Sequence, residues 1–92
     1  MKASWTFLTN QSHVLVCLIR EPEMRIRDLA VRVGVTERAI QRMVMELREA
    51  GVLTVNKQGR RNLYAINLDA PLRHEVERGV TVGELLRFLI AT

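Results

Sequence analysis

The most constraining feature of this sequence is a helical pattern between Thr36 and Gly51, which directly follows a shorter helical pattern that ends at Gly34. Thr is a favoured residue just before a helix, and Gly is favoured just after one. Between these two residues, apolar side chains recur at i, i+3, i+4 and i+7, the spacing of one buried helix face. The apolar positions are Ile40, Met43, Val44 and Leu47. We therefore predict an amphipathic helix over residues 36–50.

The segment before this helix completes a helix-turn-helix. A short helix is predicted over residues 27–33, although no Ser, Thr or Asp stands at its start. Gly34 follows it and can adopt the left-handed conformation that ends many helices. Two helices joined by such a tight turn form a helix-turn-helix, which we place at residues 26–50. Its expected apolar seam consists of Leu29, Val33, Val35, Ile40 and Met43.

A further helix is predicted before this motif, over residues 10–20. Asn10 is a suitable N-cap residue for it. We expect Phe7 and Leu8 to pack beside the start of this helix. An unbroken apolar run fills its second half, and such a helix is central and mostly buried.

Residues 52–68 have the pattern of a β-hairpin that would form a wing beside the helices. Apolar and polar residues alternate from Leu53, and residues 57–60 have the composition of a turn. The returning strand places three apolar side chains on one face, namely Tyr64, Ile66 and Leu68.

A last helix is predicted over residues 81–91. Thr81 and Glu84 have the spacing of a capping box, in which each side chain bonds the other residue's backbone N–H. The helix is apolar on more than one side, so it either closes the core or exposes an apolar patch for self-association. The candidate dimerisation residues are Leu85, Leu86, Leu89 and Ile90, with Trp5 and Phe7 as an extension of that surface.

The length of 92 residues suits a single domain, 1–92, with one modest core. The predicted fold class is mainly α with a small β-hairpin (α+β). Its expected architecture is a winged helix-turn-helix with a three-helix core, a two-stranded wing and an extra C-terminal helix.

The net charge of +4 is unevenly distributed along the chain. Nine of the 14 Lys and Arg residues lie between residues 25 and 68, where only four Asp and Glu residues occur. Twelve of the 14 are arginine, whose planar guanidinium suits phosphate groups and base edges. A localised basic region is typical of nucleic-acid binding, although it also suits a solvated surface or a high-GC coding bias.

The polar face of the 36–50 helix carries side chains suited to reading bases. At 100° per residue, the side chains opposite the apolar face are those of Arg38, Gln41, Arg42 and Met45. In the major groove Arg can bind guanine, Gln can bind adenine and Met can contact a thymine methyl. The cations of the hairpin suit phosphate or the minor groove. The candidate DNA-binding residues are Arg27, Thr36, Arg38, Gln41, Arg42, Met45, Lys57, Arg60 and Arg61.

Simpler roles are also open to these residues. Arg42 lies four residues before Glu46 and can form a surface ion pair, which is worth only about 0.5 kcal/mol. Gln41 and Met45 can be ordinary solvated surface, and the hairpin cations can merely solubilise a turn. Glu37 is more simply a partner of the helix dipole than a reader of cytosine.

The helix-turn-helix resembles the reader unit of winged helix-turn-helix transcriptional regulators, particularly small MarR-like ones. The resemblance is carried by residues 25–42, RIRDLAVRVGVTERAIQR, and residues 59–64, GRRNLY, are similar to the wing of that group. Leu63 departs from the pattern, since a charged side chain would be easily accepted there. In outline the resemblance covers residues 5–92, and it is most specific over 25–66. It implies a prokaryotic regulator that binds double-stranded DNA as a homodimer.

No catalytic or metal-binding constellation is visible. His13 and Cys17 lie one helical turn apart, but the only other histidine is His74, and a metal site needs three or four ligands. We expect Cys17 to be buried in the core. There is no glycine-rich phosphate loop and no nucleophile elbow. We therefore expect no enzymatic activity, no cofactor and no metal.

Two other function classes remain compatible with this pattern. A winged helix can be a protein-interaction module of a larger complex, or it can bind RNA or a duplex by shape alone. The longest apolar run is far shorter than the ~20 residues that span a bilayer, and no signal-peptide pattern occurs at the N-terminus. We expect a cytoplasmic, nucleoid-associated domain that does not contact the membrane, with any effector ligand unknown.

Overall fold

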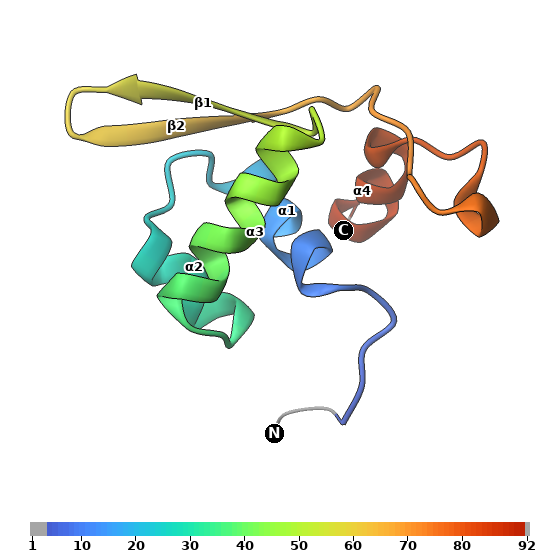
Figure 1. The fold of residues 1–92 in the computed structure, drawn as a ribbon, viewed down its shortest axis with the longest axis horizontal. Coiled ribbons are helices and arrows are strands. Elements are labelled where there is room, and N and C mark those ends of the chain that lie inside the picture. The colour runs from blue at the N-terminus through green and yellow to red at the C-terminus, as the bar shows by residue number, and fades with distance from the viewer. Residues whose placement is uncertain (1–3, 92) are drawn as a thin grey trace.

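Four α-helices and one β-hairpin make up the computed structural model, which describes residues 4–91 (Figure 1). Residues 1–3 and 92 of the predicted domain lie outside the described residues. The elements in chain order are α1 (Asn10–Arg20), α2 (Ile26–Val33), α3 (Glu37–Glu49), β1 (Leu53–Gln58), β2 (Arg61–Ile66), the 3₁₀ helix η1 (Glu75–Glu77) and α4 (Val82–Ile90). This arrangement confirms the predicted winged helix fold class.

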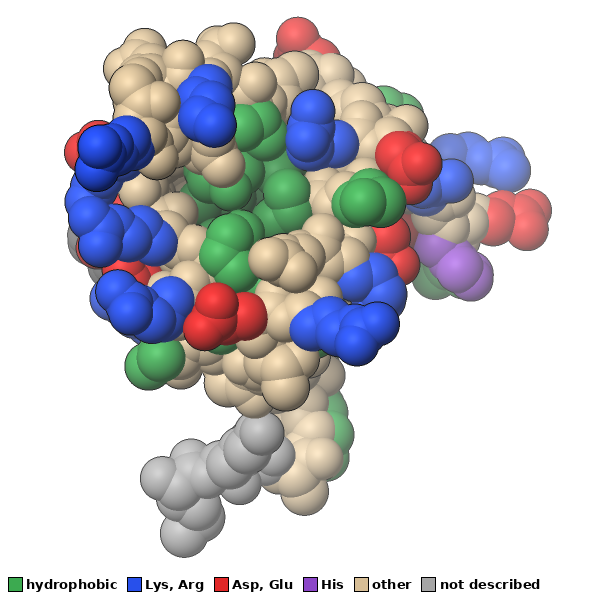
Figure 2. Space-filling model, turned by 60° about the vertical axis from the view of Figure 1, so that its left-hand side comes forward, with side chains coloured by type: hydrophobic (Ala, Val, Ile, Leu, Met, Phe, Trp, Pro, Cys, Tyr) green, Lys and Arg blue, Asp and Glu red, His purple; other side chains and the backbone are tan. Residues whose placement is uncertain are grey.

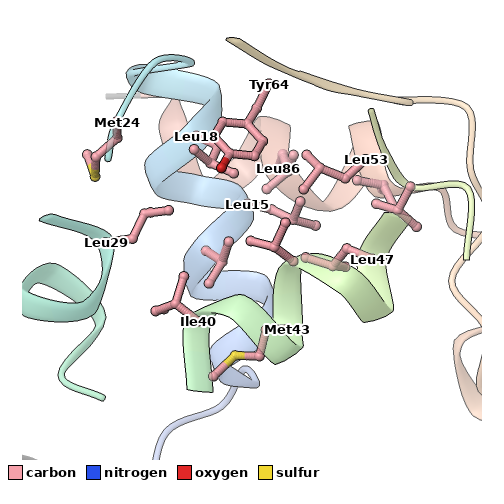
Figure 3. Packing of buried hydrophobic residues seen from close by; sticks show 14 of the residues in the cluster. Leu15, Leu18, Met24, Leu29, Ile40, Met43, Leu47, Leu53, Tyr64 and Leu86 are labelled. Atoms are coloured by element: carbon pink, nitrogen blue, oxygen red, sulfur yellow. The ribbon is translucent and has the colours of Figure 1, made fainter. Parts of the chain in front are cut away.

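Helix α1 is the centre of the core, as its apolar run predicted. It packs against α2, α3, α4 and β2. In Figure 3, Leu15 and Leu18 of α1 lie among side chains from α3, the hairpin and α4. The buried residues form one cluster, and no charged or polar side chain within residues 4–91 is buried in it.

The start of α1 differs from the prediction in two ways. Thr9, and not Asn10, is the N-cap, because Thr9 has an extended backbone and its hydroxyl accepts the Ser12 N–H at 3.3 Å. Phe7 does not pack beside the helix. It is 92% exposed and makes an edge-to-face contact with Trp5, with 4.9 Å between the ring centroids. Leu8 is half-buried.

The helix-turn-helix has the expected turns. Helix α2 starts one residue earlier than predicted, and its N-cap residue Arg25 makes no side-chain capping bond. Gly34 ends α2 in the left-handed region, at φ 86°. The Thr36 hydroxyl then accepts the Ala39 N–H at 3.0 Å and caps α3, as predicted. The apolar face of α3 is buried, so α3 is fixed against α1 and α2 by its own core side chains.

The C-terminus of α3 is closed by a Schellman motif. The Val52 N–H donates to the Leu47 carbonyl at 3.0 Å, and the Gly51 N–H donates to the Arg48 carbonyl at 3.0 Å. Val52 and Leu47 are both buried in the core. The motif turns the chain directly from α3 into the wing.

The wing is an antiparallel hairpin in which Leu53 faces Ile66 and Val55 faces Tyr64. These four side chains lie on the side that meets the helices, while the far end of the hairpin projects beyond them (Figure 1). The predicted place of Leu68 on this face is wrong. The strand ends at Ile66, because Asn67 forms a turn with its side chain accepting the Asp69 N–H at 3.1 Å, and Leu68 is exposed.

Helix α4 begins with the predicted capping box. The Glu84 N–H donates to the Thr81 hydroxyl at 3.1 Å, and the Thr81 N–H donates to the Glu84 carboxylate at 2.9 Å. Gly83 approaches the preceding loop so closely that a Cβ there would lie 2.9 Å from the Leu68 carbonyl oxygen. Helix α4 packs chiefly against α1. No helix within residues 4–91 is long and apolar enough to cross a membrane.

Candidate nucleic-acid interface

The outward face of α3 has the composition that its helical pattern predicted. Arg38, Gln41 and Arg42 are exposed, and Met45 is 62% exposed. On the opposite side of α3 the apolar side chains are buried, and Ile40 is fully inaccessible. The exposed side chains therefore lie on a helix whose position and rotation are set by the core.

Arg42 belongs to a short network that links α3 to α1. Its Nη1 lies 3.0 Å from Oε2 of Glu46, so the possible i, i+4 ion pair is present. The other oxygen of this carboxylate, Oε1, accepts a hydrogen bond from Nε2 of Gln11 at 3.1 Å. The Arg42 side chain is 62% exposed, so the pair leaves much of the guanidinium open to a further partner.

The two other helix-turn-helix candidates have different surroundings. Thr36 is exposed, but its hydroxyl already accepts the Ala39 N–H as the cap of α3. Arg27 is exposed in the first turn of α2. A contact of either residue with DNA stays a prediction.

The three cations of the wing lie in its turn or in the two strand pairs next to that turn. Lys57 is in β1, Arg60 is in the turn, and Arg61 is the first residue of β2 and pairs across the hairpin with Gln58. Arg61 is also tied to the helices, since its Nη1 lies 3.7 Å from Oε2 of Glu23 in the loop between α1 and α2. All three side chains are exposed.

The middle of the wing is attached to the helix-turn-helix through this same loop. The Tyr64 N–H of β2 donates to the Pro22 carbonyl at 2.8 Å. A hollow of about 340 Å³ lies between the wing and the start of α2, and the cations that line it are Arg25, Arg60 and Arg61. Arg25 was not among the predicted binding residues, although its place directly before α2 in the basic region was a usable signal. Figure 2 shows a face on which Lys and Arg side chains surround a hollow lined by hydrophobic side chains.

The region around Cys17 offers no metal site. Cys17 is half-buried at the edge of the core, less deeply than expected, and this burial raises the pKa of its thiol. His13 contacts Oδ1 of Asn10 through Nδ1 at 3.2 Å, and His74 caps η1 by accepting the Val76 N–H. Within residues 4–91, no group of three or more His, Cys, Asp or Glu side chains is placed to hold a metal ion.

One of the four apolar side chains predicted to form a dimerisation surface on α4 is buried. Leu86 is 1% exposed and packs in the core of its own chain, because this side of α4 faces α1. It therefore has no surface to offer a second chain. Leu85, Leu89 and Ile90 are half-buried. Phe88, which was not among the predicted dimerisation residues, is 83% exposed.

Comparison with known proteins agrees with this geometry. Residues 8–54, just over half of the chain, match the family model described as winged helix-turn-helix DNA-binding. No curated protein sequence matches the chain.

Two solved structures are similar in fold. One is ZitR of Lactococcus lactis, a zinc-responsive MarR family member, with 16% identity and a TM-score of 0.54 over 72% of this chain and 47% of that chain. The other is the PcaV transcriptional regulator of Streptomyces coelicolor, solved with its natural ligand, with 28% identity and a TM-score of 0.59 over 99% of this chain and 65% of that chain. The match thus spans about half to two thirds of the length of these regulators. The similarity to MarR-like regulators inferred from residues 25–42 and 59–64 is confirmed, and the chain belongs to the winged helix-turn-helix DNA-binding family.

Proposed function

We propose that this chain is a prokaryotic transcriptional regulator that binds double-stranded DNA with sequence specificity. In this proposal α3 enters the major groove, and the wing contacts the adjacent backbone or minor groove. The observation that carries the proposal is the division of α3 into a buried apolar face and an exposed face of arginine and glutamine, within a family of DNA-binding domains. Such a regulator acts in the cytoplasm, at the nucleoid.

The specific contacts follow from the chemistry of the exposed side chains of α3. Arg38 and Arg42 each carry donors suited to guanine O6 and N7, and Gln41 suits adenine N6 and N7. Met45 can contact a thymine methyl. Arg27 lies in the first turn of α2 and Thr36 is the N-cap of α3, so both stand at helix N-termini, where proteins often contact phosphate.

The wing contributes affinity and orientation in this proposal. Lys57, Arg60 and Arg61 are exposed cations on one projecting hairpin, and Arg25 adds a fourth cation across the hollow between the hairpin and the start of α2. Contacts of this kind hold the backbone and carry little sequence information. Each phosphate contact adds a slope of about 0.9 to the dependence of the logarithm of the binding constant on the logarithm of the salt concentration.

We further propose that the regulator is a homodimer. A domain of this size offers a short contact with DNA, and paired helix-turn-helix domains read half-sites about 34–36 Å apart. With Leu86 buried, the surface suited to pairing consists of Phe88 and the half-buried Leu85, Leu89 and Ile90, with the exposed Trp5 and Phe7 pair as its extension. A twofold interface is self-complementary, so one such apolar patch serves both subunits.

The direct test is selection from a pool of random-sequence duplexes at moderate salt, followed by sequencing of the retained DNA. We expect a defined site with two related halves. Retention of all sequences equally would support binding by shape or backbone alone. No salt-sensitive retention at all would favour a protein-interaction module, for which the exposed aromatic side chains would be the contact surface.

A further inference from the structure

Glu46 is an acidic side chain on the helix that we propose to enter the major groove. Both oxygens of its carboxylate have partners. Oε2 lies 3.0 Å from Nη1 of Arg42, and Oε1 accepts a hydrogen bond from Nε2 of Gln11 at 3.1 Å. Gln11 lies in the first turn of α1, so two helices hold this one carboxylate. Arginine–carboxylate pairs on one helix are common, but the second bond adds a constraint that a lone i, i+4 pair lacks.

The second hydrogen bond restricts where Arg42 can point. A long exposed arginine samples many rotamers, and ordering it on binding reduces the affinity that its contacts can give. Here Gln11 fixes the carboxylate, and the carboxylate in turn holds one guanidinium nitrogen of Arg42. A guanidinium has five N–H donors, so a pair through Nη1 leaves donors for the edge of a base.

The charge of Glu46 argues against a role in affinity. A carboxylate on a helix near DNA is repelled by phosphate whatever the base sequence is. The side chain of Glu46 is 46% exposed, so its ion-pair partner Arg42 offsets this repulsion only in part. A carboxylate repelled by phosphate lowers the affinity for every sequence alike. By orienting a base-reading side chain, the same carboxylate increases the difference in affinity between the right and the wrong site.

We propose that Glu46, held by Gln11, is a positioning residue that orients Arg42 and thereby sets base preference at one position of the site. This inference rests on the proposed function, because it needs α3 to read bases. Glu46 acts through Arg42 and contacts no base itself. Gln11 takes part from outside the DNA-facing helix, so its effect on specificity would be indirect.

The experiment compares Glu46→Ala with Glu49→Ala. Both changes remove one negative charge from the last turns of α3, and Glu49 has no ion-pair partner within residues 4–91. Each variant and the wild type are passed through the random-duplex selection, and their affinities are measured on the selected site and on a scrambled duplex. Circular dichroism and thermal unfolding confirm that each variant is folded.

We expect both variants to bind the scrambled duplex more tightly than the wild type and to a similar extent. Only Glu46→Ala is expected to reduce discrimination at one base-pair position, by about tenfold. In an Arg42→Ala background, Glu46→Ala should change the base preference no further, because its effect passes through Arg42. Gln11→Ala should lower discrimination at the same position with no change in charge.

The outcomes separate the two proposals. If the wild type selects no sequence, the proposed function fails. If the wild type selects a site but Glu46→Ala and Glu49→Ala have the same selection profile, the function stands and the positioning role of Glu46 is overturned. An additional loss of preference from Glu46→Ala in the Arg42→Ala background would also overturn it.

Discussion

Helices α3 and α4 are built alike at their starts and differ in what they leave exposed. Both begin after a threonine whose hydroxyl accepts a backbone N–H. The apolar side of α3 is covered by the core, and its outer side is mostly polar and charged. Helix α4 buries Val82 and Leu86 but leaves Phe88 exposed and three more apolar side chains half-covered. An amphipathic helix can bury its whole apolar face within its own chain. A helix that is apolar on several sides leaves apolar surface exposed, which a further partner can cover.

The difference arises from the area of core available to each helix. Helix α3 lies against α1, α2 and β1, so its whole apolar stripe is covered. Helix α4 lies chiefly against α1 at the other end of the molecule (Figure 1), where only one of its sides is covered. The outward face of α3 is thus suited to a charged partner such as DNA, and that of α4 to an apolar partner such as a second copy.

The largest expected effect separates the two sides of α4. Leu86→Asp places an unpaired charge in the core and should lower the free energy of unfolding by about 4 kcal/mol or more, enough to unfold much of the protein. Phe88→Asp changes an exposed side chain and should leave stability within about 0.5 kcal/mol while it weakens the proposed dimer. Urea unfolding measures the first quantity, and sedimentation at micromolar concentration measures the second.

This pair of variants can contradict the proposed difference between the buried and the exposed side of α4. If the wild type is already a monomer and still binds a half-site tightly, the exposed side of α4 has no role in pairing. If Phe88→Asp destabilises the chain as much as Leu86→Asp does, both sides of α4 belong to its own core.

The second prediction separates the two faces of α3. Ile40 is fully buried, so Ile40→Ala should destabilise the fold by about 2–5 kcal/mol, the usual range for such a truncation. Met45→Ala, on the exposed face, should change stability by less than about 0.5 kcal/mol. Both are measured by chemical unfolding, and a loss of stability in Met45→Ala equal to that of Ile40→Ala would show that Met45 is part of the packing.

The features of α3 could be predicted because they are local. Thr36, Gly34 and Gly51 define the ends of the two helices through bonds to residues only a few positions away. The apolar spacing then fixes which side of α3 is buried. The exposed arginines and glutamine follow as the remaining face. For the same reason the capping box of α4 was predictable.

The features that the sequence could not predict depend on contacts between distant segments. Glu23 meets Arg61, and Gln11 meets Glu46, only after the helices and the wing have packed. On α4, the apolar pattern does not say which side faces α1, so Leu86 was assigned to the surface. At the start of α1, Asn10 was predicted as the cap, but the extended backbone that a cap residue needs is found at Thr9.

The third prediction concerns specificity on the outward face of α3. Arg38 is exposed in the first turn of α3, opposite the buried stripe. Arg38→Ala should cost about 1–3 kcal/mol of binding free energy on the selected site and relax the choice of base at one position. Titration of labelled duplexes that differ at single positions measures this change. An equal loss on every duplex would show instead that Arg38 contacts only phosphate.

The smallest expected effect compares the two helix starts through pH. In α4 the carboxylate of Glu84 accepts bonds from the Thr81 N–H at 2.9 Å and from the Thr81 hydroxyl at 3.1 Å. These bonds favour the ionised form and lower the pKa of Glu84 below its ordinary value. The cap of α3 relies on the Thr36 hydroxyl, which does not titrate in this range.

Because the pKa of Glu84 is lower in the folded chain than in the unfolded chain, its contribution to stability is present above the unfolded value of about 4.3. That contribution is lost as the pH falls through the lowered folded value. Glu84→Gln keeps an oxygen that can accept the Thr81 N–H but removes the titration. Thermal unfolding midpoints between about pH 6 and pH 2 should therefore fall less steeply for Glu84→Gln than for the wild type. Parallel curves for the two proteins would show that the capping box of α4 is no more sensitive to acid than the simple threonine cap of α3.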